Sequence, residues 1–437
     1  MSNLKATSGR SIAESNTAPR TESNSMLGAI RVLVLIGALS LIAIGVLAGS
    51  TGFLVSFLEP SDQLILITVS VSTMALTVGL GSALAWQAWQ SIQGHGSQIF
   101  RPRYAWLWGM MFLLAVGLGH VVLQSQFVPS LIFPPLHVLA SVLPPLIVVA
   151  LAGRSLGGVT RSRDIVFQLS SGALVATVLA FTLEITLVIG MVVILLAFVA
   201  VQPGGLEQIQ ALAGHLQDPA WLEDPGSLSS LARSPLVIFS AFFVFAIAVP
   251  LIEEVVKTIG VPLRSYRRPN MSQALMWGLA GGAGFALAEG LFNSLGGMDS
   301  WAVIVSFRLG ATLLHCLTGA LMGLAWYYAL IERRWGRGLG LCAISVGIHS
   351  LWNTLVAGMA FVSLGAQGSE LTGIGQMAGE LGTVVTFSLL AILACAVAAS
   401  LVGLTRFVRS RSAAAASKAQ PVSPETETVL ATDVPGE

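Results

Sequence analysis

The sequence predicts an all-α protein that crosses a membrane about ten times. Hydrophobic residues make up 54% of the 437 residues and charged residues only 10%, whereas a soluble globular chain carries about 25% charged residues. The mean hydropathy of +0.81 points the same way. A third observation is a series of apolar stretches, most of them long enough for the roughly 20 residues that a transmembrane helix needs.

These apolar stretches fix the expected helices. The first stretch is too long for a signal peptide and has no small-residue cleavage site, so we expect it to remain as a helix. The ten expected helices are 30–58, 63–90, 104–123, 131–152, 166–201, 235–258, 272–294, 301–330, 338–364 and 380–407.

Basic residues alternate between successive loops. They precede the first helix and follow every second helix, and the group after the sixth helix comprises Lys257, Arg264, Arg267 and Arg268. The other loops hold almost no positive charge apart from Arg233. Because basic loops stay in the cytoplasm, we expect a polytopic membrane helical bundle with both termini cytoplasmic.

The chain divides into four expected parts. Residues 1–26 form a polar, disordered cytoplasmic tail, and residues 27–165 form the N-terminal transmembrane helices. Residues 166–408 form a second transmembrane bundle, which holds most of the intramembrane polar residues and an extracytoplasmic loop at 202–234 with a short amphipathic helix near 206–216. Residues 409–437 form a second disordered cytoplasmic tail.

Composition also excludes several classes of function. The net charge of +1 gives no reason to expect a nucleic-acid partner. Cys316, Cys342 and Cys395 lie in apolar runs without paired spacing. We therefore expect free, buried cysteines and neither disulfides nor a cysteine-based metal site.

Two adjacent glutamates, Glu253 and Glu254, lie inside an apolar segment. Ionisable residues at membrane depth are costly and usually functional. Lys257 follows Glu253 by one helical turn, so these two are expected to pair. Glu254 points about 100° away from Glu253, which gives the two carboxylates different roles.

The next three helices each carry a polar stripe at helical spacing. Glu289 follows Phe285 by four residues, His315 follows Arg308 by two turns, and Asn353 follows His349 by four. Glutamates and histidines converging from separate helices can build a metal or acid–base site in a bundle. A lone membrane histidine is more often an interhelical hydrogen-bonding residue. Further polar residues that could extend the site or mark a separate pathway are Glu184, His120 and His137.

The ordered motifs resemble those of the PrsW family of intramembrane proteases, which is distantly similar to the CAAX prenyl endopeptidases. They are Glu253-Glu254-x-x-Lys257, Phe285-x-x-x-Glu289 after a glycine-rich run, His315, and His349-x-x-x-Asn353. One departure follows Glu289: the family commonly has an Asn there, whereas this chain has Gly290, and its nearest Asn is Asn293.

The resemblance implies peptide-bond cleavage by a water that a glutamate activates. We assign Glu254 as the base and expect Lys257 to hold Glu253, while His349 and Asn353 bind the oxyanion or a metal. His315 and Glu289 complete the site, and Phe285 and Arg308 support it. A zinc ion would be held by residues among Glu253, Glu289, His315 and His349. A metal-free mechanism is the alternative, because the related endopeptidases can use a Glu/His pair alone.

The resemblance further implies a multi-pass protein of a bacterial cell membrane. Its substrates would be membrane-tethered proteins or peptides, including regulatory proteins such as anti-sigma factors. Two other readings stay open at this point. One is a proton-coupled secondary transporter that uses Glu184, Glu254 and Glu289, although no inverted repeat is evident. The other is a non-catalytic membrane scaffold.

Overall fold

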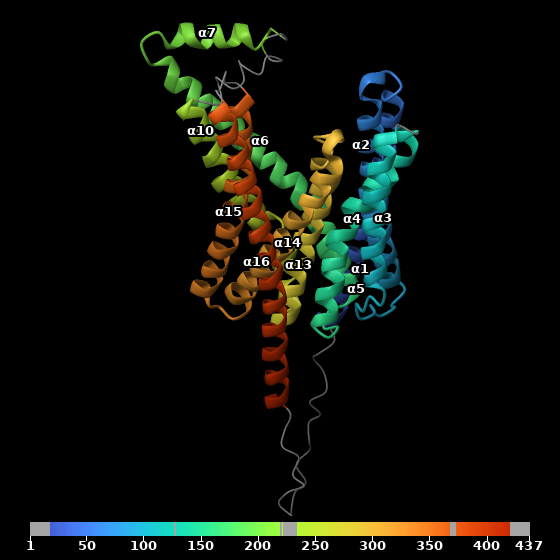
Figure 1. Cartoon of the computed structure of the whole chain (residues 1–437). Helices are drawn as coiled ribbons and strands as arrows, with labels where there is room; N and C mark the ends of the chain where they lie inside the picture. The colour runs from blue at the N-terminus through green and yellow to red at the C-terminus, as the bar shows by residue number, and fades with distance from the viewer. Residues whose placement is uncertain (1–17, 126–127, 219–220, 222–233, 368–372, 420–437) are drawn as a thin grey trace, which may run out of the picture.

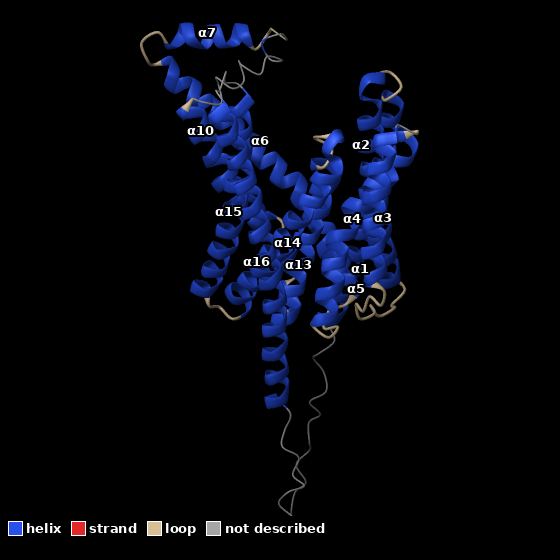
Figure 2. Cartoon of the chain, in the orientation of Figure 1, coloured by secondary structure: helices blue, strands red, loops and turns tan. Residues whose placement is uncertain are grey.

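The structure is a computed structural model, and it describes residues 18–125, 128–218, 221, 234–367 and 373–419. In this part of the chain every regular element is a helix, and the one β-bridge, between Ile99 and Arg161, joins two loops. Figure 2 shows helices connected by short loops. The predicted all-α class is therefore confirmed.

Ten helical segments of the described chain are long and apolar enough to span a membrane, as the sequence predicts. The first four are single helices: α1 (Ala18–Val55), α2 (Gln63–Ile92), α3 (Ala105–Ser125) and α4 (Pro129–Ser155). The fifth joins α5 (Ser162–Ser170), the π-helix η2 (Ser171–Ala176) and α6 (Thr177–Ala200). The sixth joins α10 (Pro235–Phe242), the π-helix η3 (Phe243–Ala248), α11 (Val249–Val256) and α12 (Gly260–Leu263).

The remaining spans carry most of the expected polar stripes. They are α13 (Met271–Asn293), α14 (Trp301–Trp326) continued by the π-helix η6 (Tyr327–Ile331), α15 (Trp335–Gln367) and α16 (Gly373–Ala419). Short 3-10 turns at Pro60–Asp62, Ser265–Arg267 and Met298–Ser300 precede α2, α13 and α14. The short helix expected near 206–216 is present as α7 (Gly205–His215).

The expected tails differ from the structure where it describes them. Residues 1–17 and 420–437 lie outside the described residues, but α1 begins at Ala18 and α16 continues to Ala419. The prediction of disorder is therefore wrong for residues 18–26 and 409–419, which are helical. At the C-terminal end the reason is the alanine run after Arg411, because alanine has the highest helix propensity.

The central helix of the bundle is α13. Nearly all of its side chains are buried, whereas the most apolar window of α6 has no buried residue. Figure 1 shows α1 to α5 on one side of α13 and α14, and α10 and α15 on the other. Because α13 contacts α4, α5 and η2 on the first side and packs against α14, which contacts α15, these two helices together connect the two sides.

Glycines let the neighbours of α13 approach its backbone. A Cβ atom on Gly278 would lie 2.2 Å from the carbonyl oxygen of Gly319, and one on Gly282 would lie 2.0 Å from that of His315. On another face, a Cβ on Gly284 would lie 2.0 Å from the carbonyl oxygen of Leu169. Since any larger residue would clash with backbone, Gly278 and Gly282 set the position of the α14 turn that carries His315, and Gly284 sets that of α5.

Candidate active site

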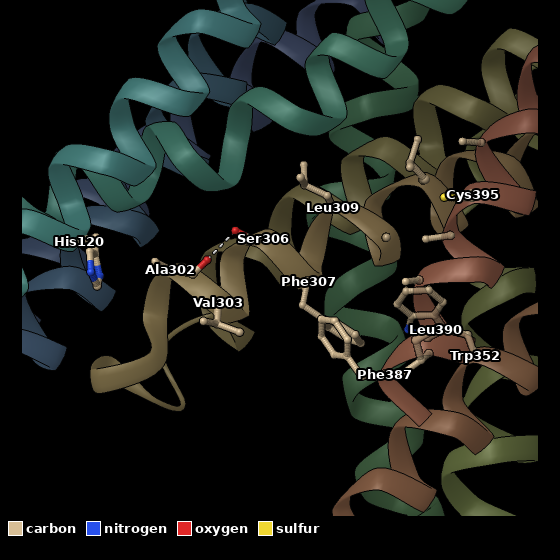
Figure 3. A pocket seen from close by; sticks show the side chains of 15 residues that line it. His120, Ala302, Val303, Ser306, Phe307, Leu309, Trp352, Phe387, Leu390 and Cys395 are labelled. Atoms are coloured by element: carbon tan, nitrogen blue, oxygen red, sulfur yellow. Dashed lines mark hydrogen bonds between the residues drawn. The ribbon is translucent and has the colours of Figure 1, made fainter. Parts of the chain in front are cut away.

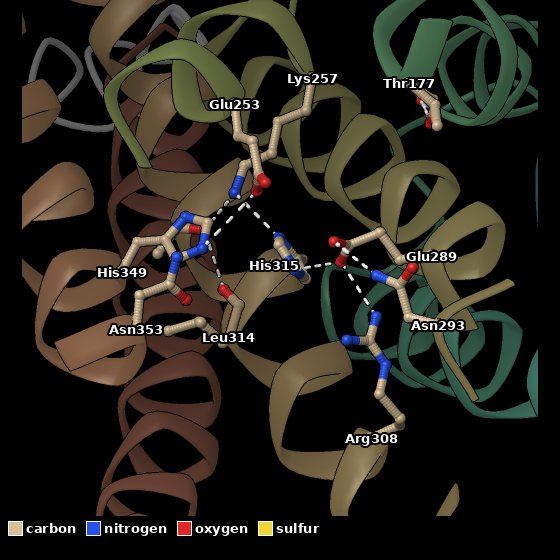
Figure 4. A network of polar contacts seen from close by, with 12 residues as sticks. Thr177, Glu253, Lys257, Glu289, Asn293, Arg308, Leu314, His315, His349 and Asn353 are labelled. Atoms are coloured by element: carbon tan, nitrogen blue, oxygen red, sulfur yellow. Dashed lines mark hydrogen bonds and ion pairs between the residues drawn. The ribbon is translucent and has the colours of Figure 1, made fainter. Parts of the chain in front are cut away.

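A polar cluster joins α11, α13, α14 and α15 inside the bundle (Figure 4). Glu254 is its most enclosed acid, and both Glu254 and Lys257 are completely buried. The Nζ atom of Lys257 lies 2.5 Å from Oε1 of Glu254 and also donates to Oγ1 of Thr318 at 2.6 Å. This pairing corrects the sequence-based expectation that Lys257 holds Glu253.

The correction has a simple geometric reason. Residues three and four positions apart both lie on one face of a helix, so spacing alone did not choose between Glu253 and Glu254. Nor does Lys257 belong to a cytoplasmic loop, as the loop count assumed, because the sixth span continues to Leu263. Its charge instead compensates a buried carboxylate, which would otherwise be costly in a membrane.

Glu254 also orients His349. Its Oε1 atom lies 2.7 Å from Nδ1 of His349, and its Oε2 atom accepts a hydrogen bond from Oγ of Ser345 at 2.8 Å. Because an ionised carboxylate only accepts hydrogen bonds, Nδ1 carries the proton. The other ring nitrogen, Nε2, lies 3.6 Å from Oε2 of Glu253.

A second carboxylate–imidazole pair faces the first. Nε2 of His315 lies 2.7 Å from Oε2 of Glu289, and Arg308 holds the same oxygen at 3.0 Å through Nη2. The same argument places the His315 proton on Nε2, so Nδ1 is left as an acceptor. Nδ1 lies 3.4 Å from Nζ of Lys257, which connects the two pairs. The rings of His315 and His349 lie edge to face at a centroid distance of 5.1 Å.

Glu253 lies beside both pairs. It is buried, and its Oε2 atom has no hydrogen-bond partner. Donor atoms of Glu253, His315 and His349 all lie within 4.8 Å of one another. A buried carboxylate oxygen without a partner is costly. The Oε2 atom of Glu253 is therefore suited to bind a water molecule or a metal ion placed next to it. Glu289, which the sequence analysis also considered as a metal ligand, lies outside this group.

The other predicted site residues surround the cluster. The Phe285 ring packs against His315 at a centroid distance of 5.4 Å. Asn293 donates to Oε1 of Glu289 at 3.4 Å. It thus supplies to Glu289 a side-chain amide that Gly290, at the position where the family commonly has an Asn, lacks. Asn353 donates from Nδ2 to the carbonyl oxygen of Phe245 at 2.9 Å. One of its two N–H groups is therefore used by η3.

The geometry of η3 follows from Pro250, near the start of α11. Proline cannot donate a backbone hydrogen bond, and its ring clashes with the preceding turn. The helix widens into the π-helix η3 just before Pro250. Such π-helical turns often occur at functional sites. Here the turn provides the Phe245 carbonyl for Asn353 and precedes α11, the helix that carries Glu253.

Two residues of the cluster carried weaker signals in the sequence. Thr318 accepts a hydrogen bond from Lys257. The sequence did not indicate this role, because a membrane threonine usually bonds its own helix. Thr318 does this as well, by donating to the Leu314 carbonyl. Ser345 lies on the same stripe as His349 and Asn353. Its contact with Glu254 was not predictable, because it depends on how α15 packs against α11.

The histidines outside the motifs belong elsewhere. His137 is fully buried; it accepts from Nε1 of Trp301 at Nδ1 and donates to the Leu291 carbonyl from Nε2, each at 2.9 Å. It therefore connects α4 with α13 and α14 and has a structural role. His120 lines a cavity of about 700 Å³ between α14, α15 and α16 (Figure 3). That cavity is on the opposite face of α14 from Arg308 and His315.

Glu184 lies nearer to the cluster. Its Oε1 atom is buried without a hydrogen-bond partner. It lies close enough to interact electrostatically with Glu253 and Glu289. No hydrogen bond or ion pair in the described part of the chain joins it to the two carboxylate–imidazole pairs.

Comparison with known protein families agrees with this geometry. The PrsW family intramembrane metalloproteases match residues 160–393, which is more than half of the chain. The chain belongs to this family. A comparison with curated proteins and one with solved structures found no match.

Membership makes this PrsW protein a peptidase of a multi-pass, intramembrane type, which acts on membrane-embedded substrates. The transporter and scaffold readings of the sequence are therefore not supported. The matched region starts just before α5 and ends within α16, so it includes every helix of the polar cluster. The helices α1 to α4 lie before the matched region.

Proposed function

We propose that this PrsW protein hydrolyses peptide bonds with a water molecule activated beside Glu253. The observation that carries the proposal is the unpartnered Oε2 atom of Glu253, which lies between two carboxylate–imidazole pairs. Glu254 and Glu289 each hold a histidine at one ring nitrogen. The other nitrogen of His349 lies near Glu253, and that of His315 lies near Lys257. This arrangement combines a carboxylate that has an unpartnered oxygen with two oriented imidazoles in a buried site.

The reaction needs a proton acceptor and a way to protonate the leaving group. Glu253 accepts a proton from water at Oε2, and the water oxygen attacks the carbonyl carbon of the substrate. The same proton then passes to the amide nitrogen as the carbon–nitrogen bond breaks. The charge on the carbonyl oxygen is stabilised by donors such as the second N–H group of Asn353. Atoms and charge balance without any further reactant.

This proposal changes the role that the sequence analysis gave to Glu254. Both of its oxygens have fixed partners in Lys257, Ser345 and His349. A carboxylate bound in this way is better suited to orient an imidazole than to take a proton from water. Glu253 has the free oxygen, so we assign it the base function and Glu254 the positioning function.

The residues present also fit a metal ion. Glu253, His315 and His349 offer one carboxylate oxygen and two imidazole nitrogens, the usual number of protein ligands for catalytic zinc. Glu254 behind His349 and Glu289 behind His315 match the carboxylates that orient metal-bound histidines. A bound zinc ion would polarise the substrate carbonyl and make a water molecule more acidic. Glu253 would then serve as a ligand of the ion instead of as the free base.

We propose membrane-tethered regulatory proteins, such as anti-sigma factors, as the substrates, and a bacterial cell membrane as the location. The support is the family resemblance together with the intramembrane position of the cluster. We also propose that water reaches the cluster from the cytoplasm. The support is that Glu253 and Glu254 precede Arg264, Arg267 and Arg268 by ten to fifteen residues, and basic loops are typical of the cytoplasmic side.

A cleavage assay tests the proposal. Purified protein in lipid vesicles is incubated with a panel of labelled single-span peptides, and the fragments are identified by mass spectrometry. We expect cleavage of a subset of the peptides by the unaltered protein and none by the Glu253→Gln variant. If the folded, unaltered protein cleaves no peptide of a broad panel, or if the variant cleaves as well, the proposal is wrong.

A further inference from the structure

The helix α6 is packed loosely although it lies beside the polar cluster. None of the residues in its most apolar window is buried. Large apolar side chains on it are exposed, among them Phe181, Ile189 and Val192. Figure 1 shows α6 running obliquely away from α13 toward α7. In a bilayer most of this helix therefore contacts lipid instead of protein.

One face of the fifth span changes character along its length. Where η2 joins α6, Ala176 and Ala180 are buried against Val256 and Phe285. Residues at the helical spacings of three, four and seven that follow on this face line an open cavity instead. The cavity has a volume of about 510 Å³, and its lining residues are Leu183, Thr186, Leu187, Gly190, Met191, Ile194, Phe243 and Ile252.

This cavity adjoins the proposed active site. Ile252 lines the cavity and directly precedes Glu253. It also packs against the buried cluster that contains Ala176 and Ala180. Phe243, which lies on the same span as Ile252 and is the first residue of η3, also lines the cavity. Glu184 follows the lining residue Leu183 and has a buried oxygen without a partner. The cavity therefore lies beside the segment that carries Glu253.

We propose that the cavity between α6 and η3–α11 is the docking groove for the membrane-spanning segment of a substrate. This inference rests on the proposed function and specifies how the substrate approaches. The lining is apolar except for Thr186, which suits the side chains of a transmembrane helix. Since α6 is exposed to lipid, a substrate helix reaches the groove sideways from the bilayer.

Glu184 has a defined part in this arrangement. A peptide bond inside a helix is cleaved only after the helix locally unwinds, and unwinding leaves backbone N–H groups without partners in the membrane. The free Oε1 atom of Glu184 accepts one of these N–H groups beside Glu253. The larger cavity between α14, α15 and α16 offers no such group, and it lies on the face of α14 away from His315.

A pair of tryptophan variants tests the groove. A Cβ atom on Gly190 meets no heavy atom within 4 Å, so Gly190→Trp fills the groove without a backbone clash. Val192→Trp adds a side chain of the same size on the exposed, opposite face. We expect Gly190→Trp to lower kcat/KM for a membrane-spanning substrate about tenfold or more, mainly through KM. Cleavage of a short soluble peptide with the same scissile sequence should change little.

A photocrosslinking experiment reads out binding without turnover. A photoreactive residue replaces Leu187 or, as the control, Val192 in the Glu253→Gln protein, and the membrane-spanning peptide is added in vesicles. We expect crosslinks to the peptide from position 187 and few from position 192. Crosslinks to lipid alone from position 187, or equal effects of the two tryptophans, would overturn the groove proposal.

The two proposals fail in different ways. If no peptide is cleaved by any version of the protein, the proposed function is wrong, while the crosslinking pattern still tests the groove. If the soluble peptide and the membrane-spanning peptide are both cleaved normally by Gly190→Trp, the proposed function stands and the groove is wrong.

Discussion

The Nδ1 atom of His349 lies 2.7 Å from Oε1 of Glu254, and this contact determines which imidazole nitrogen faces Glu253. The bond fixes the ring so that Nε2 lies 3.6 Å from Oε2 of Glu253. Glu289 holds His315 in the same manner from the other side. The two adjacent glutamates of the motif thus have different roles. Glu254 positions His349, and Glu253 keeps its Oε2 atom without a hydrogen-bond partner.

The first prediction separates the two glutamates by activity. Glu253→Gln should lower kcat by about 10²–10⁴-fold, the usual contribution of a general base. It should leave the thermal unfolding temperature almost unchanged, because Oε2 has no hydrogen-bond partner to lose. Peptide cleavage and thermal unfolding of the same preparations provide the measurement. A stable Glu253→Gln protein with normal turnover would contradict the base assignment.

The second prediction concerns the buried pair of Lys257 and Glu254. Lys257→Met should lower the free energy of unfolding by about 3–5 kcal/mol, because it leaves Glu254 as a buried charge without its partner. Adding Glu254→Gln should restore part of this loss, since the charge is then removed. Unfolding of the two single variants and the double variant measures the coupling.

A matched control for this pair is Arg334→Met, at the exposed pair with Glu332, whose atoms are 3.9 Å apart. An exposed pair contributes only about 0–1 kcal/mol, so little change is expected. Additive effects of Lys257→Met and Glu254→Gln would mean that the two side chains do not form the pair described here.

The third prediction concerns the glycine contact that positions His315. Gly282→Ala should lower the free energy of unfolding by about 1–3 kcal/mol and reduce activity, because the new Cβ would press on the His315 carbonyl. Gly290→Ala on the same helix is the control, since its Cβ would lie 3.5 Å from the nearest atom, an ordinary contact. Equal behaviour of the two alanine variants would show that the close approach of α13 and α14 is not needed.

The fourth prediction concerns the metal. Elemental analysis of protein purified without chelator should find about one zinc ion per chain, as in a catalytic site with three protein ligands. His315→Ala and His349→Ala should each lose most of this zinc, and His137→Ala should retain it, because His137 lies outside the donor group. Fully active protein that contains no metal would instead support the metal-free mechanism.

The fifth prediction concerns orientation, which the sequence suggests through its basic loops. A cysteine at Gln210 in α7 should react with an impermeant reagent from outside, and one at Gly336 only from the cytoplasm. Both positions are exposed, and Figure 1 shows α7 and the start of α15 at opposite ends of the bundle. A protein without its three native cysteines serves as the background. Labelling of both positions from the same side would refute the predicted topology.

The sequence by itself determined the number and type of the helices. Exposing long apolar stretches to water is unfavourable, so they enter the membrane. There a helix satisfies its backbone N–H and C=O groups by hydrogen bonds within itself. Local spacing also selected the polar residues, because the cost of burying Glu253, Glu289, His315 or His349 makes each conspicuous among apolar neighbours. The amphipathic spacing of α7 was likewise visible from the chain.

Only the tertiary structure decided how these residues are paired. Lys257 lies within reach of both Glu253 and Glu254 along one helix, and it binds Glu254 because Thr318 and His315 of α14 lie on that side. The separate roles of the two glutamates depend on α15, which brings Ser345 and His349 to Glu254. Such contacts follow from the packing of helices distant in sequence, and helical spacing within one segment does not contain that information.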